Sequence, residues 1–220
     1  MKFTGDEIRK AMLLYAVTDQ MWLKEGESLA DVCEKVLANG ATFLQIREKD
    51  LDETSFEQEA AKLKALCEQH HVPYVVNDSV EIALHIDADG VHVGQSDIKG
   101  RDIRAMIGPD KILGISAGTV EEAVAAEKAG ADYIGVGAIF GTSTKKNARN
   151  MTMECLKEIV SSVSIPVVAI GGISAENIQQ LCGSGVDGVA VVSAIFAAED
   201  PGKATADLLK LAEEVVACNG

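Results

Sequence analysis

The amino-acid sequence predicts a single-domain α/β protein, a (β/α)8 TIM barrel that spans residues 1–220. Eight short runs of aliphatic and β-branched residues alternate with longer amphipathic segments, as parallel strands alternate with helices. Most of the runs are apolar at consecutive positions, which is typical of strands that are buried on both faces. A doubly wound open sheet is the alternative, because it shows the same alternation. No Pro-, Gly- or Ser-rich linker suggests a second domain.

The predicted elements follow one another along the chain. Strands are predicted at residues 13–19, 43–49, 74–78, 90–94, 112–117, 133–140, 166–172 and 188–194. Helices are predicted at residues 28–40, 54–71, 119–130, 151–163, 174–185 and 204–217, and shorter helical segments follow the third and fourth strands. Helix ends are marked by Ser28 as an N-cap, Gly40 as a C-terminal residue and Thr119 at the start of a capping box.

The chain is acidic, with 34 Asp and Glu residues against 20 Lys and Arg residues and a net charge of −14. This balance argues against a nucleic-acid partner, whose binding depends on cations that meet phosphates. A local basic site for a small phosphorylated ligand remains compatible with it. Aromatic residues make up only 4% of the chain, so aliphatic side chains are expected to fill the core.

Two features bear on location. No apolar stretch approaches the length of about 18 residues that a membrane span needs, and the segment MKFTGDEIRK lacks the apolar core of a signal peptide. The cysteines are scattered without a CxxC pair, so we expect them to be reduced and mostly buried; they are Cys33, Cys67, Cys155, Cys182 and Cys218. These features predict a cytoplasmic protein with no membrane partner.

The second predicted strand carries Gln45, Arg47 and Lys49 at alternate positions. Side chains alternate between the two faces of a strand, so these three point to one side. Two cations on a face that has no carboxylate need an anionic partner. The alternative is a surface pairing of the cations with the neighbouring acids Glu48 or Asp50.

Carboxylates follow the next two strands. Asn77 and Asp78 end the third strand, and Asp97 follows the fourth. In a barrel these strand ends lie side by side at the rim where the chemistry takes place. A hard cation such as Mg²⁺ prefers one or two carboxylates together with phosphate oxygens and water. The alternative is that Asp78 and Asp97 only cap the helices that follow them.

Later strand ends carry groups that can bind anions. Ser116 ends the fifth strand, where it can donate to a phosphate or begin a helix. The polar loop 141–150 contains Lys145 and no large apolar residue; it either closes over an anion or is a charged surface loop. The pair Gly171–Gly172 and the residue Ser193 follow the seventh and eighth strands, where barrels usually bind phosphate.

The four histidines do not indicate a catalytic centre. His92 lies in the middle of the fourth strand, where a structural role is expected, and no His/Cys cluster has zinc spacing. Neither Ser116 nor Ser193 has an evident histidine partner, so a Ser-His-Asp triad is not expected.

Seven motifs taken together resemble the thiamine-phosphate synthase family. They occur in the order of that family over about residues 13–197, and the joint set is specific although each motif alone is weak. The motifs are QIREK (45–49), ND (77–78), DGVHVGQSD (89–97), GISA (114–117), GTSTK (141–145), IGGI (170–173) and VVSAI (191–195).

The resemblance implies a magnesium-dependent transferase on a single barrel. It would join 4-amino-5-hydroxymethyl-2-methylpyrimidine diphosphate to hydroxyethylthiazole phosphate and release thiamine phosphate and diphosphate. The displacement would be dissociative: the pyrimidine methylene becomes cationic before the thiazole nitrogen captures it. Small-molecule substrates are then the partners expected, and a homodimer is considered as the assembly.

The resemblance also implies roles for individual residues. Gln45 would hold the pyrimidine, and Asp78 and Asp97 would bind Mg²⁺. Thr142 and Thr144 would contact the thiazole, whose phosphate would lie on Gly172, Val192 and Ser193. The diphosphate would be held by Arg47, Lys49, Asn77, Ser116 and Lys145, of which Arg47, Lys49, Ser116 and Lys145 are the expected catalytic residues.

Three other functions fit a phosphate-binding barrel. A thiazole tautomerase would bind thiazole phosphate, but it would not need the cations and carboxylates of a diphosphate site. A regulatory thiamine-phosphate-binding protein would be favoured by an incomplete metal pair. A sugar-phosphate epimerase would need paired acid and base residues inside the barrel, and we find no convincing pair.

Overall fold

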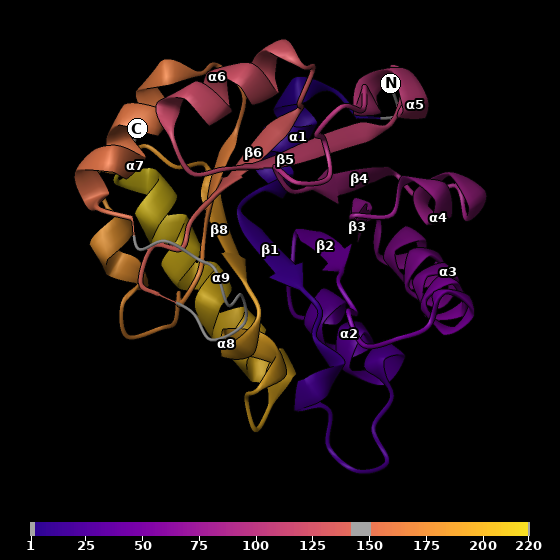
Figure 1. Cartoon of the computed structure of the whole chain (residues 1–220). Helices are drawn as coiled ribbons and strands as arrows, with labels where there is room; N and C mark the ends of the chain where they lie inside the picture. The colour runs from indigo at the N-terminus through magenta and orange to yellow at the C-terminus, as the bar shows by residue number, and fades with distance from the viewer. Residues whose placement is uncertain (1–2, 142–150, 220) are drawn as a thin grey trace.

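The computed structural model describes residues 3–141 and 151–219 and forms a closed barrel of parallel strands (Figure 1). Each strand pairs with its neighbours in sequence, and the last strand returns to pair with the first. The strands are β1 (Leu14–Val17), β2 (Phe43–Ile46), β3 (Tyr74–Asn77), β4 (Gly90–Val93), β5 (Ile112–Ala117), β6 (Tyr133–Val136), β7 (Val167–Ile170) and β8 (Gly188–Val191). The predicted barrel is therefore confirmed, and closure excludes the open sheet.

Helices surround the barrel, and most of them lie where the sequence predicts a helix. They are α1 (Gly5–Ala11), α2 (Leu29–Ala38), α3 (Glu53–His70), α4 (Val80–His85), α5 (Ile103–Ile107), α6 (Val120–Lys128), α7 (Met153–Ser162), α8 (Ser193–Phe196) and α9 (Pro201–Ala217), with short 3₁₀ helices η1 (Gln20–Trp22) and η2 (Ile178–Leu181). None of the helices within residues 3–141 and 151–219 is long and apolar enough to cross a membrane.

Alternation along each strand produces two separate cores. Leu14 and Ala16 of β1 face the helices, whereas Tyr15 and Val17 face the interior of the barrel. Because one set packs under helices and the other fills the barrel, consecutive strand positions are all buried. This double burial explains why the strand sequences are continuously apolar.

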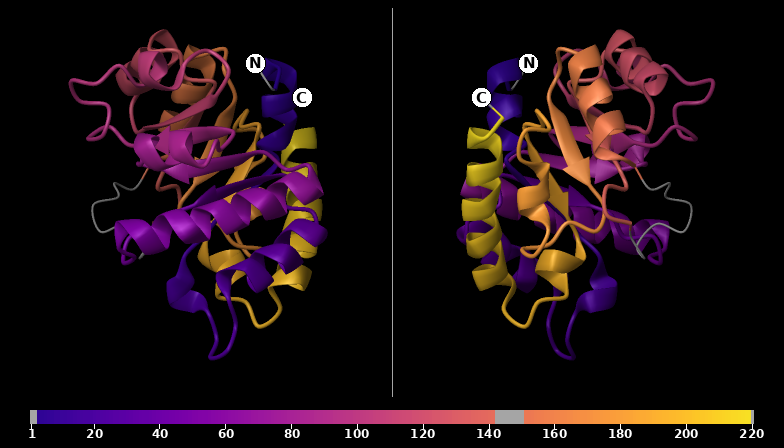
Figure 2. Two further views of the ribbon diagram at one scale, coloured as in Figure 1. Left: turned by 90° about the vertical axis from the view of Figure 1, so that its right-hand side faces the viewer. Right: turned by 90° about the vertical axis from the view of Figure 1, so that its left-hand side faces the viewer.

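Helix α1, which the sequence did not lead us to expect, closes the amino-terminal end of the barrel. Thr4 and Glu7 form a capping box at its start. Its residues Ile8 and Met12 are buried against interior side chains such as Phe43. Figure 2 shows α1 beside the C-terminal end of α9, at the same end of the molecule. Helix α1 therefore covers the interior side chains at this end of the barrel.

Two predictions of local structure need correction. Residues 174–185 were predicted to be a helix, but only the 3₁₀ turn η2 forms, and Gly183 and Gly185 adopt positive φ angles that a helix cannot accommodate. The cysteines were expected to be mostly buried, but only Cys33 and Cys67 are. Cys155 and Cys218 are exposed, and Cys182 is intermediate, with its sulfur 2.6 Å from that of Cys218.

Gly188 lies at the start of β8, which closes the barrel by pairing with β1. Its substitution tests how tightly the backbone packs at this closure. A Cβ atom at this position would lie 2.0 Å from the backbone oxygen of Met12. We expect Gly188→Ala to lower the free energy of unfolding by about 2–3 kcal/mol, because backbone must move to relieve the clash. Gly5→Ala is the control, since nothing lies within 4 Å of its added Cβ and alanine favours a helix by up to about 1 kcal/mol. Urea titration measures both, and equal stabilities would contradict this account of closure.

Candidate active site

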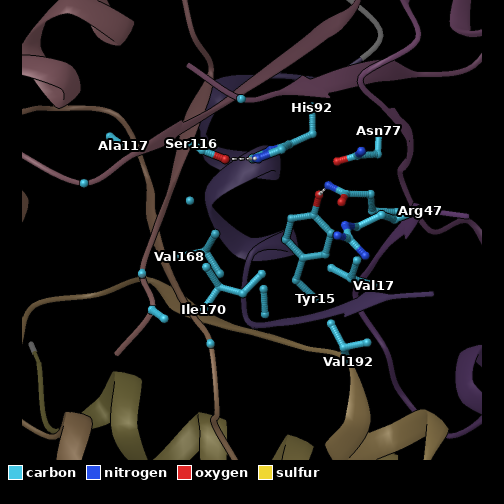
Figure 3. A pocket seen from close by; sticks show the side chains of 18 of the residues that line it. Tyr15, Val17, Arg47, Asn77, His92, Ser116, Ala117, Val168, Ile170 and Val192 are labelled. Carbon is cyan, nitrogen blue, oxygen red and sulfur yellow. Dashed lines mark hydrogen bonds between the residues drawn. The ribbon is translucent and has the colours of Figure 1, made fainter. Parts of the chain in front are cut away.

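A cavity of about 670 Å³ opens at the carboxyl ends of the strands, and all eight strands contribute to its lining (Figure 3). The figure shows Arg47 and Asn77 on one side of the cavity, and Val168 and Ile170 on the other. The predicted site residues that the structure describes all line it: Gln45, Arg47, Lys49, Asn77, Asp78, Asp97, Ser116, Gly172, Val192 and Ser193. The predicted residues Thr142, Thr144 and Lys145 lie outside the described residues.

Arg47 and Lys49 follow β2 and line the cavity, whereas Glu48, which lies between them in the sequence, does not. The buried Glu48 carboxylate accepts hydrogen bonds from the Thr18 hydroxyl (2.5 Å) and from the backbone N–H of Gln20 (2.9 Å). The same Thr18 oxygen accepts from the backbone N–H of Arg47 at 3.0 Å. Within the described part of the chain, neither Arg47 nor Lys49 forms an ion pair. The cavity is thus left with cationic groups available to an anion.

The two predicted metal ligands are held at the rim by backbone contacts. Asp78 follows β3 with a φ of 62°, and its N–H donates to the backbone oxygen of His92 on β4 at 2.8 Å. The carboxylate of Asp97 accepts from the N–H of Gly94 at 3.1 Å. Neither acid caps a helix, since Ser79 caps α4 and Asp102 caps α5. The capping alternative is therefore excluded for both.

The charge of Asp97 disfavours ionisation of the Asp78 carboxyl group. Burial, and then the charge of Asp97, raise the pKa of Asp78, while the nearby Lys49 opposes the shift. Two close carboxylates that repel each other form a donor set that a divalent cation stabilises. No cluster of three or more His, Cys, Asp or Glu residues suited to a metal occurs among the described residues. The pair fits Mg²⁺, which commonly takes one or two protein carboxylates and completes its shell with phosphate and water.

The ends of β7 and β8 bring bare backbone to the cavity. Gly171 and Gly172 have φ angles of 103° and 69°, and a Cβ at Gly172 would lie 2.1 Å from the oxygen of Gly141. The carbonyl oxygen of Gly172 accepts a hydrogen bond of 2.8 Å from the side-chain amide of Asn177. Val192 and Ser193 lie beside this turn, at the start of α8. Backbone so exposed suits a small anion such as phosphate.

Sequence reasoning missed the contacts that His92 makes inside the barrel. His92 points into the interior, with Nε2 at 3.0 Å from the hydroxyl of Ser116 and Nδ1 at 3.0 Å from that of Tyr133. Ser116 therefore does have a histidine partner, contrary to our expectation. A phenol occupies the place that a carboxylate takes in a Ser-His-Asp triad. The signal that was available is alternation, because His92 lies between two valines that face the helices.

Comparisons with known proteins agree with this geometry. The family model described as "Thiamine monophosphate synthase" matches residues 14–195. The chain belongs to this family. Thiamine-phosphate synthase from Ruminiclostridium cellulolyticum is 49% identical over 90% of the chain and 94% of the relative, and that from Methanobrevibacter smithii is 48% identical over 90% and 93%.

Solved structures place the family on this fold. Thiamine phosphate pyrophosphorylase from Pyrococcus furiosus superposes with a TM-score of 0.86 at 40% identity, covering 94% of the chain and 98% of that structure. Geranylgeranylglyceryl phosphate synthase from Thermoplasma acidophilum, at 15% identity and a TM-score of 0.70, shares the fold alone. Membership in the family makes the chain a transferase of thiamine biosynthesis.

Glu48 gives a test of the clamp that orients Arg47. Burial raises the pKa of Glu48 above its ordinary value of 4.5, against the effect of its hydrogen bonds from Thr18 and Gln20. The folded state therefore binds this proton more tightly than the unfolded state, and the stability gained from protonation is lost as pH rises through the raised value. Relative to Glu48→Gln, the wild-type protein should gain stability as pH falls from about 7 toward 4.5.

Urea titrations across that pH range measure the difference between the two proteins. The exposed Glu25 is the control, and Glu25→Gln should follow the wild-type pH dependence. A difference between wild type and Glu48→Gln that stays constant with pH would contradict the assignment.

Proposed function

We propose that the chain joins 4-amino-5-hydroxymethyl-2-methylpyrimidine diphosphate to hydroxyethylthiazole phosphate, giving thiamine phosphate and diphosphate. The observation that carries the proposal is the meeting of two different anion sites in one cavity: cations and carboxylates at β2–β4, and glycine-rich backbone at β7–β8. A tautomerase that binds only the thiazole phosphate would not need the cations and carboxylates at β2–β4.

The cationic side of the cavity suits the diphosphate. Arg47 and Lys49 would hold its oxygens together with the Asn77 amide, and Ser116 would donate from its hydroxyl across the cavity. Charge grows on the diphosphate as its bond to the pyrimidine methylene lengthens. Cations that are already in place stabilise that charge without reorganisation during the reaction.

Asp78 and Asp97 would hold Mg²⁺ beside the diphosphate. When bound, the ion supplies positive charge that neutralises the leaving group. The two carboxylates, for their part, keep that charge at the rim and away from the barrel interior, where Gln45 would hold the pyrimidine ring.

The mechanism is a dissociative displacement that needs no protein nucleophile. The pyrimidine methylene becomes cationic as diphosphate leaves, and the thiazole nitrogen then captures it. The chain contributes position: Gln45 orients one ring, while Gly172, Val192 and Ser193 fix the phosphate of the other. The apolar wall formed by Val168 and Ile170 limits the water that could quench the cation.

The coupling assay tests the proposal directly. The full chain is mixed with both substrates and Mg²⁺, and thiamine phosphate and diphosphate are quantified together. Equal amounts of the two products are expected. Consumption of substrate without thiamine phosphate would overturn the proposed reaction.

The cations should matter for turnover and not for folding. Arg47→Ala, Lys49→Ala and Lys145→Ala are each expected to lower kcat by about 100-fold or more, because each would remove a positive charge that the proposed mechanism assigns to the diphosphate. Lys62→Ala is the matched control, since Lys62 lies on α3 and pairs with Glu59 on the surface. Thermal denaturation should show similar stability for all four variants. Near wild-type kcat in Arg47→Ala would remove that residue from the site.

Activity should depend on a divalent cation held by the two acids. We expect an excess of chelator to abolish turnover and added Mg²⁺ to restore it. Asp78→Asn and Asp97→Asn should each raise the Mg²⁺ concentration that gives half-maximal rate by about tenfold or more. Asp6→Asn, at the opposite end of the barrel in α1, should leave that concentration unchanged. Full activity in chelator would remove Asp78 and Asp97 as metal ligands.

A further inference from the structure

Five polar side chains form a continuous row across the interior of the barrel. The amide Nε2 of Gln45 lies 2.6 Å from the hydroxyl of Tyr15, which lies 2.8 Å from that of Tyr133. The row continues from Tyr133 to Nδ1 of His92 and from Nε2 of His92 to Ser116, each step 3.0 Å long. Figure 3 shows the contact between Ser116 and His92, with Tyr15 in the same cavity. Each member comes from a different strand.

The middle of the row is sealed from water. Tyr15 and Tyr133 are 1% and 0% exposed, and the ring of Phe43 packs against both of them. Burial raises the pKa of both phenols far above the neutral range, so both remain protonated. The buried hydroxyls must satisfy their hydrogen bonds within the row.

Two glycines make room for these side chains. A Cβ at Gly114 would lie 2.2 Å from the Tyr133 ring and 2.6 Å from His92 Nδ1. A Cβ at Gly135 would lie 3.3 Å from His92 Cε1. The backbone at these two glycines therefore lies directly against the side chains of His92 and Tyr133, and it leaves little room for another arrangement of the row.

The chemistry of the groups gives the row a direction. An amide nitrogen can only donate, so Tyr15 accepts from Gln45 and donates to Tyr133. Tyr133 in turn donates to Nδ1 of His92, which places the proton of the neutral imidazole on Nε2. That proton is donated to the oxygen of Ser116. The Ser116 hydroxyl hydrogen is then left to point into the cavity.

We propose that Tyr15, Tyr133 and His92 are positioning residues that transmit the orientation of the Gln45 amide to the hydroxyl of Ser116. With the amide nitrogen toward Tyr15, Ser116 donates to an anionic oxygen in the cavity. With the amide turned over, every donor in the row reverses, and Ser116 donates to His92 instead. The assignment of the pyrimidine to Gln45 and of the diphosphate to Ser116 rests on the proposed function, whereas the order of the hydrogen bonds does not.

The row links the two halves of one substrate. An aminopyrimidine offers an N–H donor beside a ring-nitrogen acceptor, and the oxygen and the second N–H of the Gln45 amide can meet both. An amide held this way by the pyrimidine also sets Ser116 as a donor for the diphosphate. Binding of the correct ring therefore prepares the site for the leaving group.

The tautomer of His92 tests the direction of the row without any substrate. The full chain is labelled with ¹⁵N-histidine, the ring nitrogen shifts are recorded near pH 8, and His92→Asn assigns the signals. We expect one neutral tautomer with its proton on Nε2. Tyr15→Phe cuts the row beside Gln45, so both tautomers should appear. A proton on Nδ1 in the wild type, or an unchanged tautomer in Tyr15→Phe, would overturn the proposal.

Tyr74→Phe is the matched control, because it also removes a buried hydroxyl from a strand. That hydroxyl donates to the backbone oxygen of Ala60 at 3.0 Å, on the helix side of the barrel and outside the row. The His92 tautomer should not respond to it. An equal response to Tyr74→Phe would mean that the tautomer reports general loosening of the barrel.

Kinetics supply the second readout. Ser116→Ala should lower kcat/KM by about tenfold more in the wild-type background than in the Tyr15→Phe background, since the two act through one row. The loss should be equal in the wild-type and Tyr74→Phe backgrounds. Additive losses from Tyr15→Phe and Ser116→Ala would overturn the coupling. If the wild type forms no thiamine phosphate, the proposed function fails, and the tautomer measurement still decides the order of the row.

Discussion

Burial of both faces of a closed parallel sheet is the constraint on which the rest of the structure depends. Pairing of β8 with β1 leaves no strand edge, and every strand then has one set of side chains under helices and another inside the barrel. Parallel closure also brings all carboxyl ends to one rim. Residues as distant in sequence as Gln45 and Ser193 can share a cavity only for this reason.

The acidic charge of the whole chain says little about what the cavity binds, because the direction in which each charged side chain points matters more than the net charge. Glu48 lies between two cations in sequence, yet its carboxylate is fastened to Thr18 and Gln20. Arg47 and Lys49 are left facing the cavity. Two acids that do reach the rim, Asp78 and Asp97, are close enough for the charge of Asp97 to act on Asp78. A strongly anionic protein can thus present a local site for anions and a cation together.

Polar groups inside a barrel must be paired, and here the pairing has a functional consequence. Among the described residues, the phenols of Tyr15 and Tyr133 find hydrogen-bond partners only along the row from Gln45 to Ser116. Gly114 and Gly135 leave the volume that this row occupies. A row in which each hydroxyl has a fixed neighbour can carry orientation from one end to the other, as an apolar core cannot.

The sequence by itself determined the alternation of strands and helices, the helix starts at Ser28 and Thr119, and the strand ends that carry polar residues. These depend on local patterns of burial and capping. It could not exclude an open sheet, because closure depends on β8 meeting β1, and it missed α1, whose burial exists only once there is a barrel end to close.

The partnership of His92 with Ser116 was likewise decided by tertiary structure. The register of β4 and β5 sets His92 opposite Gly114, so that Ser116, two residues further on, lies on the same interior face and within reach. The pairing of β4 with β5 brings these residues together, and the sequence of either strand alone does not show which residue of the other it will meet.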